Sequence, residues 1–282
     1  MMTKFWFYTF FLNVFFVSNA AALSVFIRTG SYQIGTESVY KTTIRQDSLI
    51  DITPTPYYVS QSTFLQITIH NLDTVLHELA WNDQASGVVV PALGNVTITR
   101  NITGVQIFTL FCNDFSGKLL GGSFSIISGI PNSHLFYWEL WETQSNINAQ
   151  IANQNLTAFP NPFRPNVFTI NGSEYPLNMN DTLGLVQGQV GDSIYICVVN
   201  AGAMPHSLHF HGYHFKIMHS TKLPNRMNWE KDSGPILQND AMILLLVPDK
   251  PGSYPVHDHN LTANTGNGGY PGGMMTMLMI EP

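Results

Sequence analysis

Two short histidine-bearing segments constrain the fold of this chain more than any other feature of its sequence. Residues 206–215 read HSLHFHGYHF and carry four histidines, and residues 252–259 read GSYPVHDH and carry two more. We predict that both segments form β-strands, in which successive side chains point to opposite faces of a sheet. The rest of the chain is then a scaffold that must bring these two strands together.

The alternation along these strands sorts their side chains into two layers. Four histidines of matching parity form one set, which we call the His cluster: His209, His211, His257 and His259. If the two strands are neighbours, these imidazoles converge on one point, and histidine is the most common metal ligand in proteins. His206 and Asp258 have the opposite parity, so they should point together into the other layer.

Short alternating segments recur along the chain and predict an all-β protein. We expect strands over residues 44–51, 64–70, 96–102, 106–111, 123–127, 135–142, 167–170, 192–200, 208–218, 241–247 and 274–280. Gly, Pro, Asn and Asp separate them, as in a sandwich or barrel. A polar loop is expected over residues 143–165. A break near residue 130 divides the chain into two units, residues 23–130 and 131–282, and about 260 residues suffice for two domains.

The first residues are typical of a secretory signal peptide. Lys4 precedes an apolar run over residues 5–17, which ends in small residues. The run is shorter than the roughly 20 residues that a membrane-spanning helix needs, so we favour cleavage after Ala20 or Ala22 over a membrane anchor. We therefore assign residues 1–22 to the signal peptide and expect a secreted protein with no membrane segment after cleavage.

Composition supports an extracellular protein and argues against nucleic acid as a partner. Six Asn-X-Ser/Thr sequons indicate a glycoprotein in a secreted chain: Asn95, Asn101, Asn155, Asn171, Asn180 and Asn260. Charged residues make up 11% of the sequence and the net charge is −6, so no basic surface for nucleic acid is expected. An oxidising compartment permits a disulfide between Cys112 and Cys197, but two cysteines make no disulfide scaffold.

The residues around the His cluster resemble the copper signatures of multicopper oxidases, the family of laccase, ascorbate oxidase and ceruloplasmin. The resemblance rests on Asn200, H-x-x-H-x-H-G at 206–212, Phe215, G-x-Y-x-x-H-x-H at 252–259, and the segments 168–176 and 249–252. It is strong from about residue 168 to residue 279 and weaker before that. The resemblance implies tandem cupredoxin-like domains, which are Greek-key β-barrels, and copper as the metal.

The resemblance also assigns roles to the individual histidines. In that family the first histidine of the H-x-x-H-x-H run binds a type 1 blue copper, which puts His206 in that position. The His cluster falls in positions that bind the trinuclear copper centre. The type 1 cysteine is replaced by Asp258, and no histidine follows His259. A blue site needs a thiolate and two imidazoles, so we expect it to be lost. We expect His206 and Asp258 to form a buried hydrogen-bonded pair, with a second, hard-metal site as the alternative.

The first half of the chain departs further from the family pattern. The positions of its trinuclear ligands are taken by other residues: Ala80, Asn82, Phe111 and Asn113. His77 and Cys112 would be half of a blue site, and we expect a buried cysteine beside a core histidine there. A trinuclear centre draws its eight histidines equally from two domains. Oligomers cannot supply the missing half, because every copy lacks it, so four-electron reduction of dioxygen is not expected.

Three functions fit these observations. The first is a copper-dependent oxidoreductase with a mononuclear centre in the His cluster, acting on a small-molecule reductant and lacking a type 1 site. The second is a non-catalytic copper-binding or carrier glycoprotein, with zinc as the alternative metal. The third is a metal-free interaction module whose inherited histidines pack against the first domain. The sequence leaves the oligomeric state open.

Overall fold

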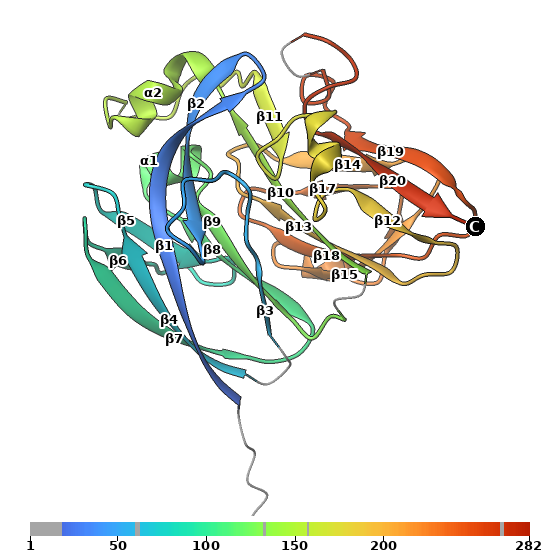
Figure 1. Ribbon diagram of the computed structural model, residues 1–282, viewed down its shortest axis with the longest axis horizontal. Coiled ribbons are helices and arrows are strands. Elements are labelled where there is room, and N and C mark those ends of the chain that lie inside the picture. Colours follow the sequence, from blue (N-terminus) through green and yellow to red (C-terminus); the bar gives the residue numbers. More distant parts are fainter. Residues whose placement is uncertain (1–18, 60–62, 132–133, 157, 266–267) are drawn as a thin grey trace, which may run out of the picture.

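The computed structural model describes residues 19–59, 63–131, 134–156, 158–265 and 268–282, and these residues form an all-β molecule in two halves (Figure 1). The predicted signal peptide lies almost wholly outside the described residues. The strands β1–β9 make one half, and β10–β20 make the other. Among the described residues, no helix has the length and apolarity needed to cross a membrane.

Two sheets build the first half. One has the order β2-β1-β4-β7 and the other has the order β3-β9-β8-β5-β6. Their strands are β1 (Asn19–Ile34), β2 (Glu37–Arg45), β3 (Tyr57–Val59), β4 (Thr63–Asn71), β5 (His77–Trp81), β6 (Val88–Val90), β7 (Asn95–Ile102), β8 (Gln106–Cys112) and β9 (Ser123–Ser128). Alternation decides which faces are buried: in β4, Leu65, Ile67 and Ile69 are fully buried in the core between the sheets.

Two further sheets build the second half. Their orders are β11-β10-β13-β18-β15-β16 and β12-β20-β19-β14-β17. Their strands are β10 (Leu135–Thr143), β11 (Val167–Ile170), β12 (Val186–Gln189), β13 (Ile194–Asn200), β14 (His206–Phe210), β15 (Phe215–Ser220), β16 (Glu230–Lys231), β17 (Ser233–Ile236), β18 (Ala241–Leu246), β19 (Gly252–Asp258) and β20 (Met275–Glu281). Trp138, Phe210 and Leu278 belong to the core between these sheets.

Short helical segments lie between some of the strands. They are α1 (Phe115–Leu119), α2 (Ser145–Ala152) and two 3₁₀ turns, Leu177–Asn180 and Pro224–Arg226. The expected loop over residues 143–165 therefore contains the helix α2. Its buried residue Ile151 packs with Leu119 and Leu120, a tertiary contact that local polarity does not reveal.

The structure corrects several predicted strands. The expected strand at 44–51 is wrong beyond Arg45, where β2 ends, and β1 was not predicted at all. The expected strand at 208–218 is two strands in different sheets, β14 and β15. The chain turns between them at Gly212, whose φ of 79° favours glycine. A side chain there would also meet the ring of Tyr254 at 2.5 Å.

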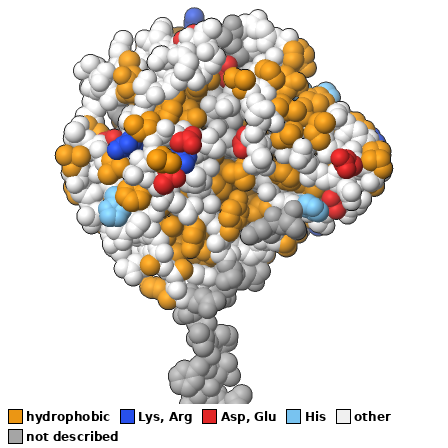
Figure 2. Space-filling view, viewed as in Figure 1, with side chains coloured by type: hydrophobic (Ala, Val, Ile, Leu, Met, Phe, Trp, Pro, Cys, Tyr) orange, Lys and Arg blue, Asp and Glu red, His pale blue; other side chains and the backbone are white. Residues whose placement is uncertain are grey.

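Burial also revises the surface and cysteine predictions. Asn171 is 3% exposed and its amide donates to the backbone oxygen of Tyr137, so this sequon is not a surface site. The other five sequon asparagines are exposed. Cys112 and Cys197 are both free and buried. Figure 2 shows few charged side chains, scattered over a face on which hydrophobic side chains are common.

The two halves share a buried junction. Ile107, Phe111 and Ile127 from the first half pack with Tyr137 and Cys197 from the second. Beside this apolar patch, Nζ of Lys41 lies 2.6 Å from Oε1 of Glu139, and both side chains are 2% exposed. Lys41 is on β2 and Glu139 is on β10, so this buried ion pair ties the halves together. The hydroxyl of Ser123 donates to the same carboxylate.

We expect the substitution Lys41→Met to lower the free energy of unfolding by about 3–5 kcal/mol, because it leaves the Glu139 carboxylate buried without its cation. The control Lys41→Met with Glu139→Gln removes both charges and should recover most of that loss. Urea unfolding followed by tryptophan fluorescence measures both. Equal losses in the single and double variants would contradict this role of the ion pair.

Candidate metal centre

The antiparallel pairing of β14 with β19 positions the predicted metal ligands. In this register His209 lies directly opposite His257. His211 follows β14, and its backbone N–H donates to the oxygen of Pro255, while the N–H of His259 donates to the oxygen of Ser207. The backbone therefore places His209 and His257 side by side, with His211 and His259 on opposite sides of this pair along the strands.

The rings of the His cluster do come together. The ring centroid of His209 lies 4.7 Å from that of His211, 5.7 Å from that of His257 and 5.6 Å from that of His259. The centroids of His211 and His257 are 5.1 Å apart. The ring of His209 thus neighbours the other three rings, but the four imidazoles do not meet at one point in the described chain, and metal binding by them stays a prediction.

Two nitrogens of the His cluster face each other at short range. Nε2 of His211 lies 3.0 Å from Nε2 of His257. Nδ1 of His257 donates to the backbone oxygen of Asp258 at 2.8 Å, which leaves its Nε2 unprotonated in the neutral ring. Nδ1 of His209 is 2.7 Å from the hydroxyl of Ser233. These outer hydrogen bonds are of the kind that orients ligating histidines.

Burial and the neighbouring rings favour the neutral form of His211. Burial lowers the pKa of His211, and the charges of His209 and His257 lower it further, so the ring is neutral near pH 7. A neutral His211 ring that carries its proton on Nε2 donates to the unprotonated Nε2 of His257, and a cation could take the place of that proton. No three donor atoms of the His cluster lie within 4.8 Å of one another in the described chain. His209 or His259 must therefore rotate to supply a third ligand to an ion held by His211 and His257.

The His cluster faces solvent. His211 and His259 are exposed, and His209 and His257 are half-buried. The alternative that these histidines pack against the first domain is therefore wrong for this chain. Exposure gives small molecules or a second protein chain direct access to the site.

His206 lies on the other face of β14, as its parity predicted, and is buried. Its Nδ1 is 2.5 Å from Oδ2 of Asp258, and its Nε2 is 2.9 Å from Oε2 of Glu142. The predicted hydrogen bond with Asp258 is confirmed. Both ring nitrogens are engaged by carboxylates on opposite sides, so neither is free for a metal, and the carboxylates do not meet at one point. The sequence pattern did not reveal Glu142, because it is 64 residues away in the chain.

Burial alone would lower the pKa of His206, but the carboxylates of Asp258 and Glu142 outweigh it and raise the pKa to about 9. The ring is therefore an imidazolium near pH 7. Oε1 of Glu142 also accepts the backbone N–H groups of Ala203 and Met204 at 2.7 and 2.8 Å. A charged hydrogen-bonded unit thus occupies the place where the family resemblance puts a blue copper.

The trinuclear positions of the first half carry no metal donors. Asn82 donates through its amide to the hydroxyl of Thr221 at 2.7 Å, and Asn113 donates to Glu78 at 2.9 Å. With Lys222 these positions line a cavity of about 200 Å³. A cationic side chain there disfavours a copper ion, so the residues of the first half do not fit a trinuclear centre.

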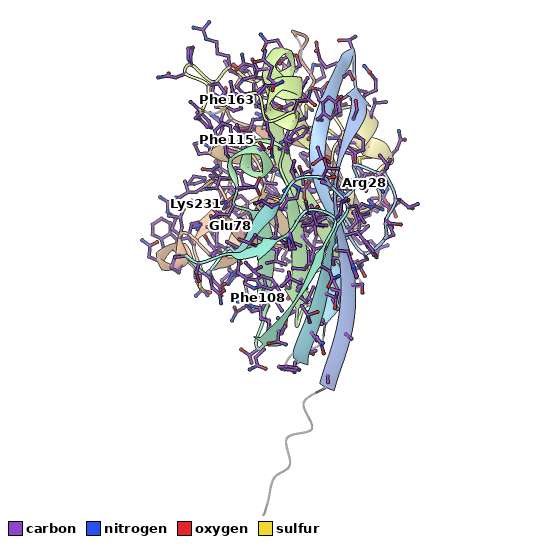
Figure 3. All side chains as sticks on the ribbon, turned by 90° about the vertical axis from the view of Figure 1, so that its left-hand side faces the viewer. Arg28, Glu78, Phe108, Phe115, Phe163 and Lys231 are labelled. Atoms are coloured by element: carbon purple, nitrogen blue, oxygen red, sulfur yellow. The ribbon has the colours of Figure 1, made fainter. Side chains whose placement is uncertain are left out.

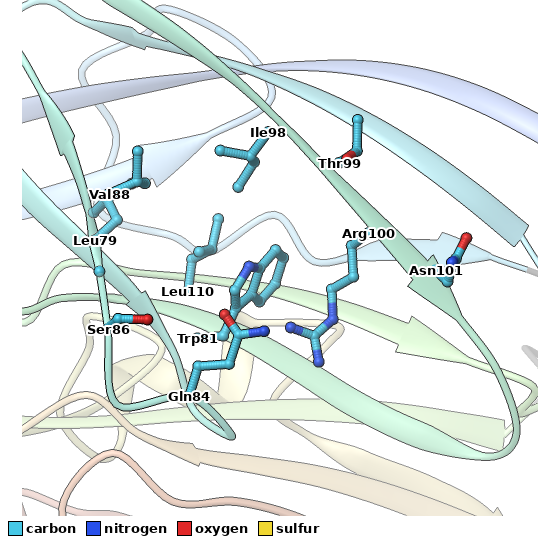
Figure 4. Close-up of a pocket in the computed structure, with 11 residues that line it drawn as sticks. Leu79, Trp81, Gln84, Ser86, Val88, Ile98, Thr99, Arg100, Asn101 and Leu110 are labelled. Carbon is cyan, nitrogen blue, oxygen red and sulfur yellow. The ribbon is translucent and has the colours of Figure 1, made fainter.

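A larger hollow of about 510 Å³ lies elsewhere in the first half (Figure 4). Arg100 lies over the ring of Trp81 at 4.4 Å and over the ring of Phe108 at 4.3 Å, and it forms an ion pair with Asp83. Its cation is therefore already engaged. None of the predicted ligands lines this hollow.

The histidines outside these sites have ordinary environments. His70 stacks on Phe26 with ring centroids 4.9 Å apart, and Nε2 of His134 is 3.6 Å from Oδ2 of Asp192. His214 is exposed. These positions agree with structural or surface roles.

Comparison with known proteins connects this geometry to a family. Residues 143–277 match the sequence model of the family described as Multicopper oxidase. Residues 143–277, just under half of the chain, are thus similar in sequence to multicopper oxidases. This match includes every residue of the His cluster, His206 and Asp258. No curated protein matches the chain in sequence.

Solved structures show the fold over nearly the whole chain. A blue copper oxidase from Nitrosomonas europaea has a TM-score of 0.75 and 16% identity, over 93% of this chain and 86% of that chain. A copper nitrite reductase from Nitrosomonas europaea has a TM-score of 0.71 and 14% identity, over 93% of this chain and 94% of that chain. A laccase from Botrytis aclada has a TM-score of 0.69 and 12% identity, over 93% of this chain and 53% of that chain. The prediction of two tandem cupredoxin-like Greek-key β-barrels is confirmed.

The imidazolium of His206 predicts how stability depends on pH. Its folded pKa of about 9 is above the unfolded value of about 6.5, so its contribution is complete below about pH 6.5 and lost as pH rises through about 9. The free energy of unfolding should fall by up to about 3 kcal/mol over this pH range. In Asp258→Asn this pH dependence should shrink, because one of the two carboxylates is gone.

Urea unfolding of both proteins between about pH 6 and about pH 10 measures this difference. Parallel pH profiles for the natural protein and Asp258→Asn would contradict a charged His206.

Proposed function

We propose that this protein is a secreted, copper-binding member of the multicopper oxidase family whose His cluster holds a single copper ion. The observation that carries the proposal is the 3.0 Å separation of Nε2 of His211 and Nε2 of His257. His209 would complete the site, with Ser233 orienting its ring. Imidazoles suit copper, and an open position would remain for a substrate.

We further propose a copper-dependent oxidoreductase activity at this centre. A bound copper ion would supply one-electron redox chemistry with a small-molecule reductant and dioxygen. The chain's own residues would hold the ion and leave it accessible through the exposed rings of His211 and His259. The first half offers no matching donors at Ala80, Asn82, Phe111 or Asn113, so the centre would be mononuclear.

The exposure of the His cluster also favours a second candidate function, a copper carrier. Exposed ligands exchange a metal with another protein more readily than buried ones. A carrier would bind the same ion at the same residues but would not turn over a reductant. Zinc is the alternative metal, and the metal content of the secreted protein decides between them.

We expect His257→Ala with His259→Ala to weaken copper binding roughly 100-fold or more, since loss of even an outer-shell partner of a metal typically costs 10–100-fold. His214→Ala is the matched control, because His214 is exposed in the same segment as His211, and its affinity should not change. Titration with copper, followed by electron paramagnetic resonance, gives the affinity and the stoichiometry, which should be one ion per chain at this site. Undiminished binding in the double variant would place the copper elsewhere.

Turnover separates the oxidoreductase from the carrier. The copper-loaded protein should consume dioxygen when a phenol, ferrous iron or ascorbate is added, and His257→Ala with His259→Ala should lose that activity. Full copper binding without oxygen uptake would reject the enzyme and leave the carrier. No intense blue absorption is expected in either case at this centre, because no thiolate lies in the His cluster.

A further inference from the structure

A second group of metal-ligating side chains lies in the first half of the molecule. His77 begins β5, Cys112 ends β8, and Asp114 precedes α1. One donor atom of each lies within 4.8 Å of the others, and this is the only such group of three in the described part of the chain. Figure 3 labels Glu78 and Phe115, the neighbours of His77 and Asp114, on the same side of the molecule.

The ring of His77 is fixed so that one nitrogen points into this group. Its Nε2 is 3.0 Å from Oδ2 of Asp73, and both carboxylate oxygens of Asp73 accept the N–H of Thr29 at 2.9 Å. Its Nδ1 is buried, since His77 is only 2% exposed, and it makes no hydrogen bond with any described residue, but it faces Oδ1 of Asp114 at ion-pair distance, 3.4 Å. A carboxylate on the far nitrogen is the usual support of a metal-binding histidine.

The other two donors are held just as firmly. Oδ1 of Asp114 accepts the N–H of Glu78 at 3.2 Å, and Oδ2 accepts the N–H of Gly117 at 2.9 Å. Gly117 and Gly122 enclose Cys112, since a side chain at Gly122 would lie 2.4 Å from its Sγ. The Asp114 side chain is 18% exposed, which gives the group a path to solvent.

The spacing and the charge suit a tetrahedral divalent cation. Nδ1 of His77 is 3.4 Å from Oδ1 of Asp114, and ligands bound at about 2.0–2.3 Å in a tetrahedron lie about 3.5 Å from one another. A thiolate from Cys112 and the carboxylate of Asp114 would neutralise a 2+ ion. The group has one imidazole, whereas a blue copper site needs two with the thiolate.

We propose that His77, Cys112 and Asp114 bind one zinc-type divalent cation, with water as the fourth ligand. The site is separate from the His cluster and joins β5, β8 and the start of α1. It revises our expectation that Cys112 is only a buried cysteine beside a core histidine. The partner that the sequence pattern did not supply is Asp114, which lies two residues after Cys112 on the turn into α1.

Cobalt(II) tests this site in the full-length, reduced protein. It replaces zinc, and only a thiolate ligand gives it an intense near-ultraviolet charge-transfer band. The natural protein should show that band with one cobalt per chain, and Cys112→Ser should abolish it. Cys197→Ser is the matched control, because Cys197 is also free and buried but has no metal-binding group beside it, and it should keep the band.

A second variant separates binding from folding. Asp114→Asn keeps a side chain that can cap α1 but removes the charge, and it should weaken cobalt binding roughly tenfold or more. His257→Ala with His259→Ala should leave the band unchanged, which distinguishes this site from the His cluster. The proposal is overturned if the natural protein shows no band with excess cobalt, if Cys197→Ser loses it, or if Asp114→Asn binds with unchanged affinity.

Discussion

The pairing of β14 with β19 is the constraint on which the candidate centre depends. Because His209 faces His257 across this pair, a shift of one residue in register would send the histidines to the opposite face. Gly212 ends the segment by turning the chain away from β14, so that His211 stays near His257. The candidate metal centre is therefore a consequence of strand register rather than of any single loop.

The same register builds a different structure on the other face of the two strands. His206 and Asp258 point inward together, and Glu142 from β10 closes the far side of the ring. Two carboxylates and an imidazolium form a charged, fully hydrogen-bonded unit where the sequence resemblance puts a blue copper. Asp258 satisfies one nitrogen of the buried imidazole at the position where the sequence resemblance puts a thiolate.

The sequence predicted the fold class and the shared face of the His cluster because both rest on period-two alternation. It failed where tertiary contacts decide: the helix α2 is stabilised by packing of Ile151 rather than by its own pattern. Glu142 and Asp114 were also missed as partners of histidines. Glu142 is distant in sequence from His206, and Asp114 contacts His77 only because β5 pairs with β8. The spacing of residues along one segment cannot reveal partners that different strands bring together.

We propose that one copper ion lies between the rings of His211 and His257, with no partner ions held by the first half. Anomalous X-ray diffraction at the copper edge, on crystals of the copper-loaded protein, tests this most directly. We predict one anomalous peak per chain within bonding distance of Nε2 of both histidines, about 2 Å. A cluster of three peaks, or no peak beside these two nitrogens, would contradict it.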